Sequence, residues 1–423
     1  MTARNGAPAT RDIPEQRRVL AVLVLAQLLS GAGLAAGITI GALLAEEMLG
    51  STGLAGVPSG LFTAGAALGA AGIGRICRRW GRRPGLALGY ATGALGSLGV
   101  VVAATSGSVP LLFLSLLVYG AGTATNLMAR YAGADLASPA RRGRAVSTVL
   151  FATTLGAVAG PNLVEVTGEL ALSWGVPRLA GPFLLATAAF GAAAVVLAAL
   201  LRPDPLRLAQ ALARRPATPA GPPAPAAGEE RRPATGPYRR GVVGGTAVVL
   251  VGQLVMISVM TMTPVHMQAH GHDTGAAGLV IALHVGAMFL PSPLTGLLVD
   301  RLGRRWVAAA CGPVLLAAGV LAATAPPHSV ALLATALVLL GLGWNFGLVS
   351  GTAMVTDALP PERRAPVQGL VDVGIALAGA AGSLASGLVV MLGGYPALAL
   401  AGGLLALTVV PLAVWAVPQS GKS

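Results

Sequence analysis

Long apolar runs recur along the whole chain, and short polar segments separate them. Twelve of these runs are long enough to cross a bilayer as a helix, which takes about 18 or more residues. Their approximate cores are 19–44, 54–75, 85–104, 109–134, 144–166, 179–201, 242–265, 275–298, 306–324, 329–356, 366–391 and 395–417. Because backbone polar groups inside a bilayer need internal partners, these runs predict an all-α polytopic membrane protein with twelve transmembrane helices.

Composition supports the same class, since 10% of the residues are charged, against about 25% in a soluble domain. The net charge of +13 comes from arginines that gather in alternate connections between the runs. Basic residues favour the cytoplasmic side of a membrane, so we expect both termini in the cytoplasm and the chain in the inner (plasma) membrane of the cell. The basic excess marks a membrane face, and we expect no binding to nucleic acid. The arginine clusters lie at 17–18, 75–83, 141–144, 202–240, 301–305 and 363–364.

The segment between the sixth and seventh runs differs from the rest of the chain. It is rich in proline, arginine and alanine and cannot bury enough apolar surface to fold alone, so we expect a disordered cytoplasmic linker over 202–240. Asp204 and Pro205 could begin one short amphipathic helix in it, lying on the membrane surface. The predicted domains are an N-terminal bundle over 1–201, this linker, and a C-terminal bundle over 241–423.

The two halves of the chain repeat each other at an offset of 222 residues. Residues 74–83 (GRICRRWGRR) correspond to 296–305 (GLLVDRLGRR), and Asp135 corresponds to Asp357 at the same offset. The second of these segments resembles the G-x-L-x-D-R-x-G-R-R motif of the major facilitator superfamily. That resemblance implies two six-helix bundles that rock about a substrate site near the bilayer midplane. The first copy departs from the motif, because Arg78 stands where the family usually carries aspartate.

The same resemblance implies charge pairs that hold the bundles together at their cytoplasmic face. We expect Asp135 to lie near Arg82 and Asp357 near Arg304, with Asp300 completing the motif of the second half. Asp372, inside the eleventh run, could carry a coupling proton, but we expect it to pair with an arginine of the 78–83 loop.

Lysine usage bears on the energy source. The only lysine of the chain is Lys422, so no phosphate-binding loop of the G-x-x-x-x-G-K-[ST] type exists. A transporter without this loop is a secondary carrier or needs a separate motor. Together with the family resemblance, this leads us to expect a monomeric secondary carrier of a small ion or molecule, neither an enzyme nor a cofactor-dependent protein.

Methionine and histidine concentrate in one part of the sequence. Of ten methionines and five histidines, nine fall between residues 256 and 288, over the seventh and eighth runs and their connection. Met256 and Met260 share one helix face, as do His284 and Met288 on the next run. Met256 and His284 each lie roughly 15 Å from the outer membrane surface, and the short connection should make the two helices neighbours.

These side chains predict a soft metal site at the midplane. Thioether sulfur and neutral imidazole suit Cu(I) better than magnesium, calcium or manganese, and a histidine in mid-membrane is usually functional. The pattern of Met256, Met260, His284 and Met288 resembles the paired Met and His-Met motifs of CcoA-type copper importers, which implies copper as the transported substrate. An outer group could capture the ion first: Met262, His266, Met267, His270 and His272.

Two other interpretations stay open. Apolar packing explains many methionine stripes, and the copper importer branch also resembles riboflavin carriers. Polar residues in other spans could bind a small organic solute, or could join helices as hydrogen-bonding residues often do in membranes. A glycine-proline segment over 156–161 resembles a motif of drug–proton antiporters, so efflux is a further possibility. The candidate contacts to an organic solute are Gln27, Asn126, Gln253 and Asn345.

Overall fold

The computed structural model describes residues 14–34, 44, 47–48, 56–214 and 235–416, and every regular element within them is helical. The N-terminal half contains α1 (Pro14–Leu34), α3 (Gly56–Trp80), α4 (Arg82–Ser106), α5 (Val109–Asp135), α6 (Arg142–Ser173), α7 (Gly181–Leu200) and α8 (Pro205–Ala213). The C-terminal half contains α9 (Thr235–Ala269), α10 (Thr274–Phe289), α11 (Ser292–Leu302), α12 (Arg304–Thr324), α13 (Val330–Asp357), α14 (Pro361–Ala406) and α15 (Val409–Ala416). Two short 3-10 turns, η2 (Pro139–Arg141) and η3 (Arg178–Ala180), precede α6 and α7.

Twelve spans can be traced through these helices. Nine helical stretches of the described residues are long and apolar enough to cross a membrane. The stretch from Pro361 to Ala416 supplies two spans, because Gly394 breaks it with a φ of 77°. This left-handed conformation favours glycine, which has no Cβ atom to clash with the backbone. Adding α1 and α6 gives the twelve expected spans, and the eighth is divided into α10 and α11 at Pro291.

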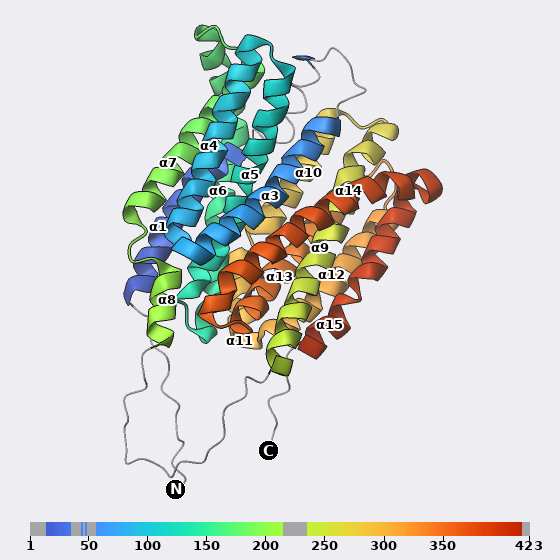
Figure 1. The fold of residues 1–423 in the computed structure, drawn as a ribbon. Coiled ribbons are helices and arrows are strands. Elements are labelled where there is room, and N and C mark those ends of the chain that lie inside the picture. The colour runs from blue at the N-terminus through green and yellow to red at the C-terminus, as the bar shows by residue number, and fades with distance from the viewer. Residues whose placement is uncertain (1–13, 35–43, 45–46, 49–55, 215–234, 417–423) are drawn as a thin grey trace, which may run out of the picture.

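The two halves repeat the same packing pattern. In the first half α4 packs against α5 and α7, α3 packs against α5, and α1 packs against α6. In the second half α12 packs against α13 and α14, α10 packs against α13, and α9 packs against α14. Figure 1 shows the halves side by side, blue to green on one side and yellow to red on the other. The fold is that of two six-helix bundles, as the internal repeat predicts.

The expected linker is described only in part. Asp204 caps α8 as predicted, because its Oδ1 accepts hydrogen bonds from the backbone N–H groups of Leu206 and Arg207 at 3.0 and 3.1 Å. α8 packs on α4, α5 and α14, with Leu206 buried, so this helix lies against the protein. The prediction of disorder covers 202–240, and it is wrong at both ends of that range, because α8 forms over Pro205–Ala213 and α9 already begins at Thr235. Residues 215–234 lie outside the described residues.

The halves meet mainly through α3 against α14 and α11 against α6. Five connections between helices lie at one end of the molecule, which we call the arginine-rich end. They are α3–α4, α5–α6, α7–α8, α11–α12 and α13–α14. Across the described residues, the hydrogen bonds and ion pairs between the halves lie toward this end. The structure is therefore closed at the arginine-rich end.

Candidate functional site

The methionines and the histidine predicted at the midplane are largely buried. Met256, Met288 and His284 are buried, and Met260 is half-buried. The Nδ1 atom of His284 hydrogen-bonds to the carbonyl oxygen of Leu337 on α13 at 2.8 Å. Its Nε2 atom is buried with no hydrogen-bond partner in the described part of the chain. A buried imidazole nitrogen with an unused lone pair or proton is available to a ligand.

The two helices that carry these residues contact each other less than the short connection between them predicts. α9 and α10 touch at few positions, while each packs extensively on α13. The pair Met256 and Met260 is thus linked to the pair His284 and Met288 mainly through α13. In the described segments no group of three or more His, Cys, Asp or Glu side chains is placed to hold a metal ion, so a metal here would depend on thioethers.

The predicted outer group is divided by the structure. Met267 is fully buried in the core of the C-terminal half, and Met262 is half-buried. His272 is directed to the carbonyl oxygen of Pro327, 2.9 Å from its Nε2 atom. These three residues do not share one open surface.

Two histidines of that group do come together with residues outside it. The rings of His266 and His270 lie 4.4 Å apart between centroids, and His266 stacks on Tyr395 of α14 at the same distance. His328 lies 6.4 Å from His270 by the same measure. Neither Tyr395 nor His328 is close to these histidines in sequence, so only the fold reveals the cluster.

Gln27 and Asn126 form part of a closed hydrogen-bond network inside the N-terminal bundle. Gln27 donates to the carbonyl oxygen of Asn126 at 3.0 Å and to the hydroxyl of Thr153 at 2.7 Å. Ser30 donates to Asn126 Oδ1 at 2.8 Å, and the hydroxyl of Tyr90 donates to Gln27 Oε1. All five residues are buried. Their arrangement joins α1, α4, α5 and α6, which fits the helix-joining interpretation.

Asn345 has a comparable role in the C-terminal bundle. Its side-chain nitrogen donates to the carbonyl oxygen of Met288 and to the hydroxyl of Ser292, both at 2.7 Å. Its Oδ1 accepts a hydrogen bond from Thr295 at 2.5 Å. Asn345 thereby holds α13 against the point where α10 passes into α11.

Gln253 is placed differently from the other amides. It is half-buried on α9, and its Oε1 accepts a hydrogen bond from the indole N–H of Trp344 on α13 at 2.7 Å. Trp344 contacts Phe289 of α10 edge to face, with ring centroids 5.5 Å apart. The amide nitrogen of Gln253 faces Gly379 of α14, where an added Cβ atom would lie 3.5 Å away. Four helices therefore meet at an amide and two aromatic rings.

A buried ion pair joins the two halves toward the arginine-rich end. Arg130 of α5 donates to Asp372 Oδ1 of α14 at 2.7 Å and to Thr352 of α13 at 3.0 Å. The hydroxyl of Tyr131 also donates to Asp372 at 3.3 Å. The expectation that Asp372 pairs with the 78–83 loop is wrong, because α5 brings Arg130 closer. An arginine inside an apolar span is itself a functional signal, and it could have identified Arg130 in the sequence.

At the arginine-rich end the gating residues form two matching groups. Asp135 accepts from Arg82 of its own half at 2.8 Å, with both side chains fully buried, and its carbonyl accepts from Arg364 of the other half at 3.1 Å. Arg82 also reaches Gln368 of α14. The second group repeats this plan, since Asp357 pairs with Arg304 of its own half and with Arg142 of the other. The structure thus brings Asp135 near Arg82 and Asp357 near Arg304.

Asp300 belongs to a contact that only the second half makes. Its Oδ1 accepts from the backbone N–H of Gly143 at 2.8 Å, and its Oδ2 from the N–H of Arg144 at 3.1 Å. Both N–H groups lie in the first turn of α6, where backbone N–H groups lack an acceptor within the helix and a negative charge is favourable. The Nε of Arg144 adds a third bond at 3.0 Å. Arg78, at the equivalent position of the first half, is exposed.

Comparison with known proteins agrees with this architecture. The family model described as Major Facilitator Superfamily matches residues 23–292 and 245–423. Two Bacillus subtilis proteins, the uncharacterized MFS-type transporters YdeG and YddS, are 54% and 50% identical, over 94% and 96% of this chain and 92% and 93% of theirs. The riboflavin transporter RfnT of Brucella anthropi is 32% identical over 85% of this chain and 86% of its own. The human organic anion transporter MFSD10 superposes with a TM-score of 0.74 at 19% identity, covering 95% of this chain and 100% of that structure.

Proposed function

The chain belongs to the major facilitator superfamily and is a secondary transporter, not an enzyme; from that premise we propose that it carries a small organic solute with an aromatic ring system, of the riboflavin type. The observation that carries this proposal is the meeting of Gln253, Trp344 and Phe289 on α9, α13 and α10. Binding sites for such solutes combine aromatic faces with a few oriented polar groups. The 32% identity to a riboflavin transporter over most of both chains supports the same solute class.

The proposed cycle follows from where the halves are closed. With the arginine-rich end in the cytoplasm, as the positive-inside rule favours, the contacts between the halves close the carrier on its cytoplasmic side. The solute enters between the halves from the opposite end and reaches the aromatic cluster. Release to the cytoplasm then requires the contacts around Asp135, Asp357, Asp300 and Asp372 to separate.

Copper is the second candidate substrate, and one observation favours it. The buried Nε2 atom of His284 has no hydrogen-bond partner among the described residues, and buried Met288 follows one helical turn later. An imidazole nitrogen and a thioether are suitable ligands for Cu(I). Met256 and Met260 of α9 would complete such a site only if their side chains reached it past α13.

One set of variants separates the two substrates. In cells that depend on this carrier, Gln253→Leu and Trp344→Phe should lower riboflavin uptake about ten-fold or more, because each removes one side of the Trp344–Gln253 hydrogen bond and Gln253→Leu also removes an amide that orients the solute. Met256→Leu and Met288→Leu preserve volume and should leave uptake within about two-fold of wild type. Uptake is measured with labelled riboflavin, and cellular copper is measured in the same cultures.

The copper alternative predicts the reverse pattern. Copper accumulation would then fall in His284→Leu, Met256→Leu and Met288→Leu and would persist in Gln253→Leu. Met260→Leu should have a smaller effect if that residue transfers the ion without holding it. Equal amounts of each variant in the membrane are the control. Unchanged riboflavin uptake in both Gln253→Leu and Trp344→Phe would refute the organic-solute proposal.

A further inference from the structure

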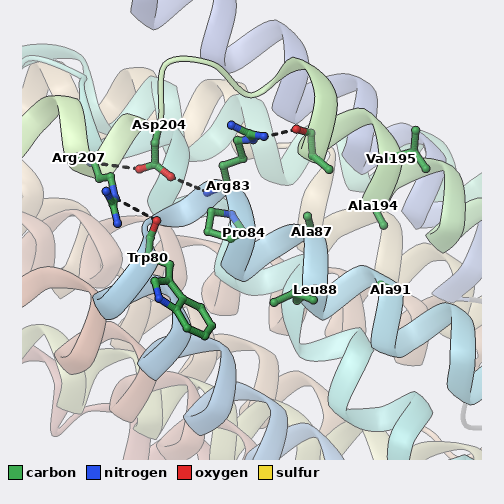
Figure 2. A pocket seen from close by; sticks show the side chains of 11 residues that line it. Trp80, Arg83, Pro84, Ala87, Leu88, Ala91, Ala194, Val195, Asp204 and Arg207 are labelled. Atoms are coloured by element: carbon green, nitrogen blue, oxygen red, sulfur yellow. Dashed lines mark hydrogen bonds between the residues drawn. The ribbon is translucent and has the colours of Figure 1, made fainter.

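A groove runs along the outer surface of the N-terminal half between α4 and α7. Its volume is about 790 Å³, and small apolar residues of these two helices form most of its wall, among them Ala87, Leu88, Ala91, Ala194, Val195 and Ala198. Figure 2 shows that α4 supplies one wall and α7 the other. Polar residues line only one end, where Trp80, Arg83 and Arg207 lie beside Asp204.

The groove faces the region of the acyl chains. Leu88 and Val195 on its rim are 48% and 67% exposed, as large apolar side chains are on a lipid-facing surface. From Arg83 to Ala91 the groove covers nine residues of α4, whose ends lie about 12 Å apart along the helix. Half of the hydrocarbon thickness of a bilayer is about 15 Å. The groove therefore has the length of one leaflet, and its polar end coincides with the arginine-rich end of the molecule.

A second pocket of about 240 Å³ adjoins that polar end and is strongly basic. Arg78, Arg79, Arg207 and Arg214 line it, and Arg207 also lines the apolar groove. Arg207 therefore borders both spaces. A ligand that fills both needs a negative charge at one end and a hydrocarbon chain at the other.

Neither Arg83 nor Arg207, the two arginines at this junction, forms an ion pair with a carboxylate among the described residues, whereas Arg214 of the second pocket lies 4.0 Å from Glu362. The Nε of Arg83 donates to the carbonyl oxygen of Ala198 at 2.8 Å, and that of Arg207 donates to the carbonyl oxygen of Trp80 at 3.0 Å. Asp204 is the acidic residue nearest to them. Its carboxylate already accepts the backbone N–H groups of Arg83, Leu206 and Arg207 at 2.7, 3.0 and 3.1 Å.

The second half of the protein has no equivalent arrangement. Arg301 and Arg305 correspond to Arg79 and Arg83 in the repeat, but no helix comparable to α8 follows the second bundle in the described chain. Arg78 replaces the acidic residue that Asp300 supplies in the second half, so the first half alone gathers positive charge here. The repeat therefore provides a matched control for the charge.

We propose that this groove is a binding site for an anionic phospholipid of the cytoplasmic leaflet. One acyl chain lies between α4 and α7 along the alanines, and the phosphate lies among Arg79, Arg83 and Arg207. Trp80 sits at the level of the head group, where tryptophan is favoured in membrane proteins. The apolar groove is what selects a lipid over a soluble anion, because a free phosphate would use only the basic end.

The test uses full-length protein purified in detergent, stripped of lipid and titrated with phosphatidylglycerol or phosphatidylcholine of identical chains, with binding followed by native mass spectrometry. Wild type should prefer phosphatidylglycerol by about ten-fold or more. Arg79→Gln and Arg207→Gln should each weaken its binding roughly five-fold, the effect expected for one basic side chain at an anionic lipid surface. The matched control Arg301→Gln, at the position that corresponds to Arg79 in the repeat, should change it by less than about two-fold.

The apolar part of the site is tested independently of the charges. Ala91→Phe and Ala198→Phe fill the groove and should weaken binding of phosphatidylglycerol, while Ala192→Phe, on an exposed face of α7 outside the groove, should not. Equal binding of the two lipids would overturn the proposal. The proposal would also be overturned if glycerol 3-phosphate competed with phosphatidylglycerol and the groove-filled variants still bound phosphatidylglycerol fully. The site would then be one for a soluble anion. Variants are compared only when size-exclusion profiles and thermal unfolding match wild type, and the charge and groove variants test the site separately.

Discussion

At the scale of single residues, the ion pair Arg130–Asp372 is a contact between the two halves that buries two charges. Both side chains are almost fully removed from solvent, at 0% and 4% exposure. Buried charges are tolerated when they are paired and hydrogen-bonded, and here Tyr131 and Thr352 supply additional bonds. When the halves separate at this end, both charges lose their partners at once. The pair therefore opposes opening until water or a proton compensates the charges.

Removing one member of this pair should be worse than removing both. Asp372→Asn or Arg130→Gln alone leaves an uncompensated or poorly compensated buried polar group, which costs about 3–5 kcal/mol. The double variant Arg130→Gln/Asp372→Asn should recover much of the lost thermal stability, because amides can hydrogen-bond to each other. Thermal unfolding of the purified single and double variants measures this coupling. Losses that simply add in the double variant would show that the pair does not stabilise this closed state.

The sequence predicts some of these residue contacts and misses others for a physical reason. The partners of Asp135 and Asp357 follow from the repeat, since each aspartate is the last residue of a helix and each arginine the first residue of another helix at the same membrane face. Arg130 has no counterpart in the repeat, because Thr352 stands at the equivalent position. Its pairing with Asp372 depends on the rotation of α5 against α14, which hydrophobic patterning does not determine.

At the scale of helices, the contact between Asp300 and the start of α6 should make the two repeats mechanically unequal. Asp300→Asn keeps the shape of the side chain but removes its charge and one acceptor, and hydrogen bonds to charged groups contribute about 1.5–3 kcal/mol. We expect this change to impair the transport cycle about ten-fold or more, with substrate affinity nearly unchanged. Arg78→Asn should be mild, because Arg78 is exposed. Transport rate and equilibrium binding measured in both variants test this, and equal damage would remove any mechanical meaning from the asymmetry.

Helix positions are predicted well where apolar runs and capping residues agree, as they do at Asp204 and α8. They are predicted less well where packing decides the outcome. The eighth span is one apolar run in the sequence, yet it divides at Pro291 into α10 and α11, and Asn345 binds both sides of the division. The short connection between α9 and α10 predicts neighbours, but the two helices make few contacts with each other because each packs extensively against α13.

At the scale of the whole molecule, the repeat predicts two bundles but not which end of them is closed. A rocking carrier has at least two arrangements of the same helices, and the apolar pattern is common to both. The closed end is decided by tertiary contacts, among them the approach of α3 to α14. A Cβ atom placed on Gly74 would lie 3.1 Å from the Cα atom of Gly369, so the two backbones almost touch.

That contact yields a test of the conformational equilibrium. Gly74→Leu introduces a side chain where the backbone of α14 leaves no room, so the halves should separate at the arginine-rich end. Spin labels at the exposed positions Arg18 and Arg301 would report the separation as a longer distance by electron resonance. Gly72→Leu is the matched control, because a Cβ atom at Gly72 meets nothing within 4 Å although it lies on the same helix. An unchanged distance in Gly74→Leu would mean that the approach of α3 to α14 does not hold this end closed, and that the ion pairs around Asp135 and Asp357 are sufficient to do so.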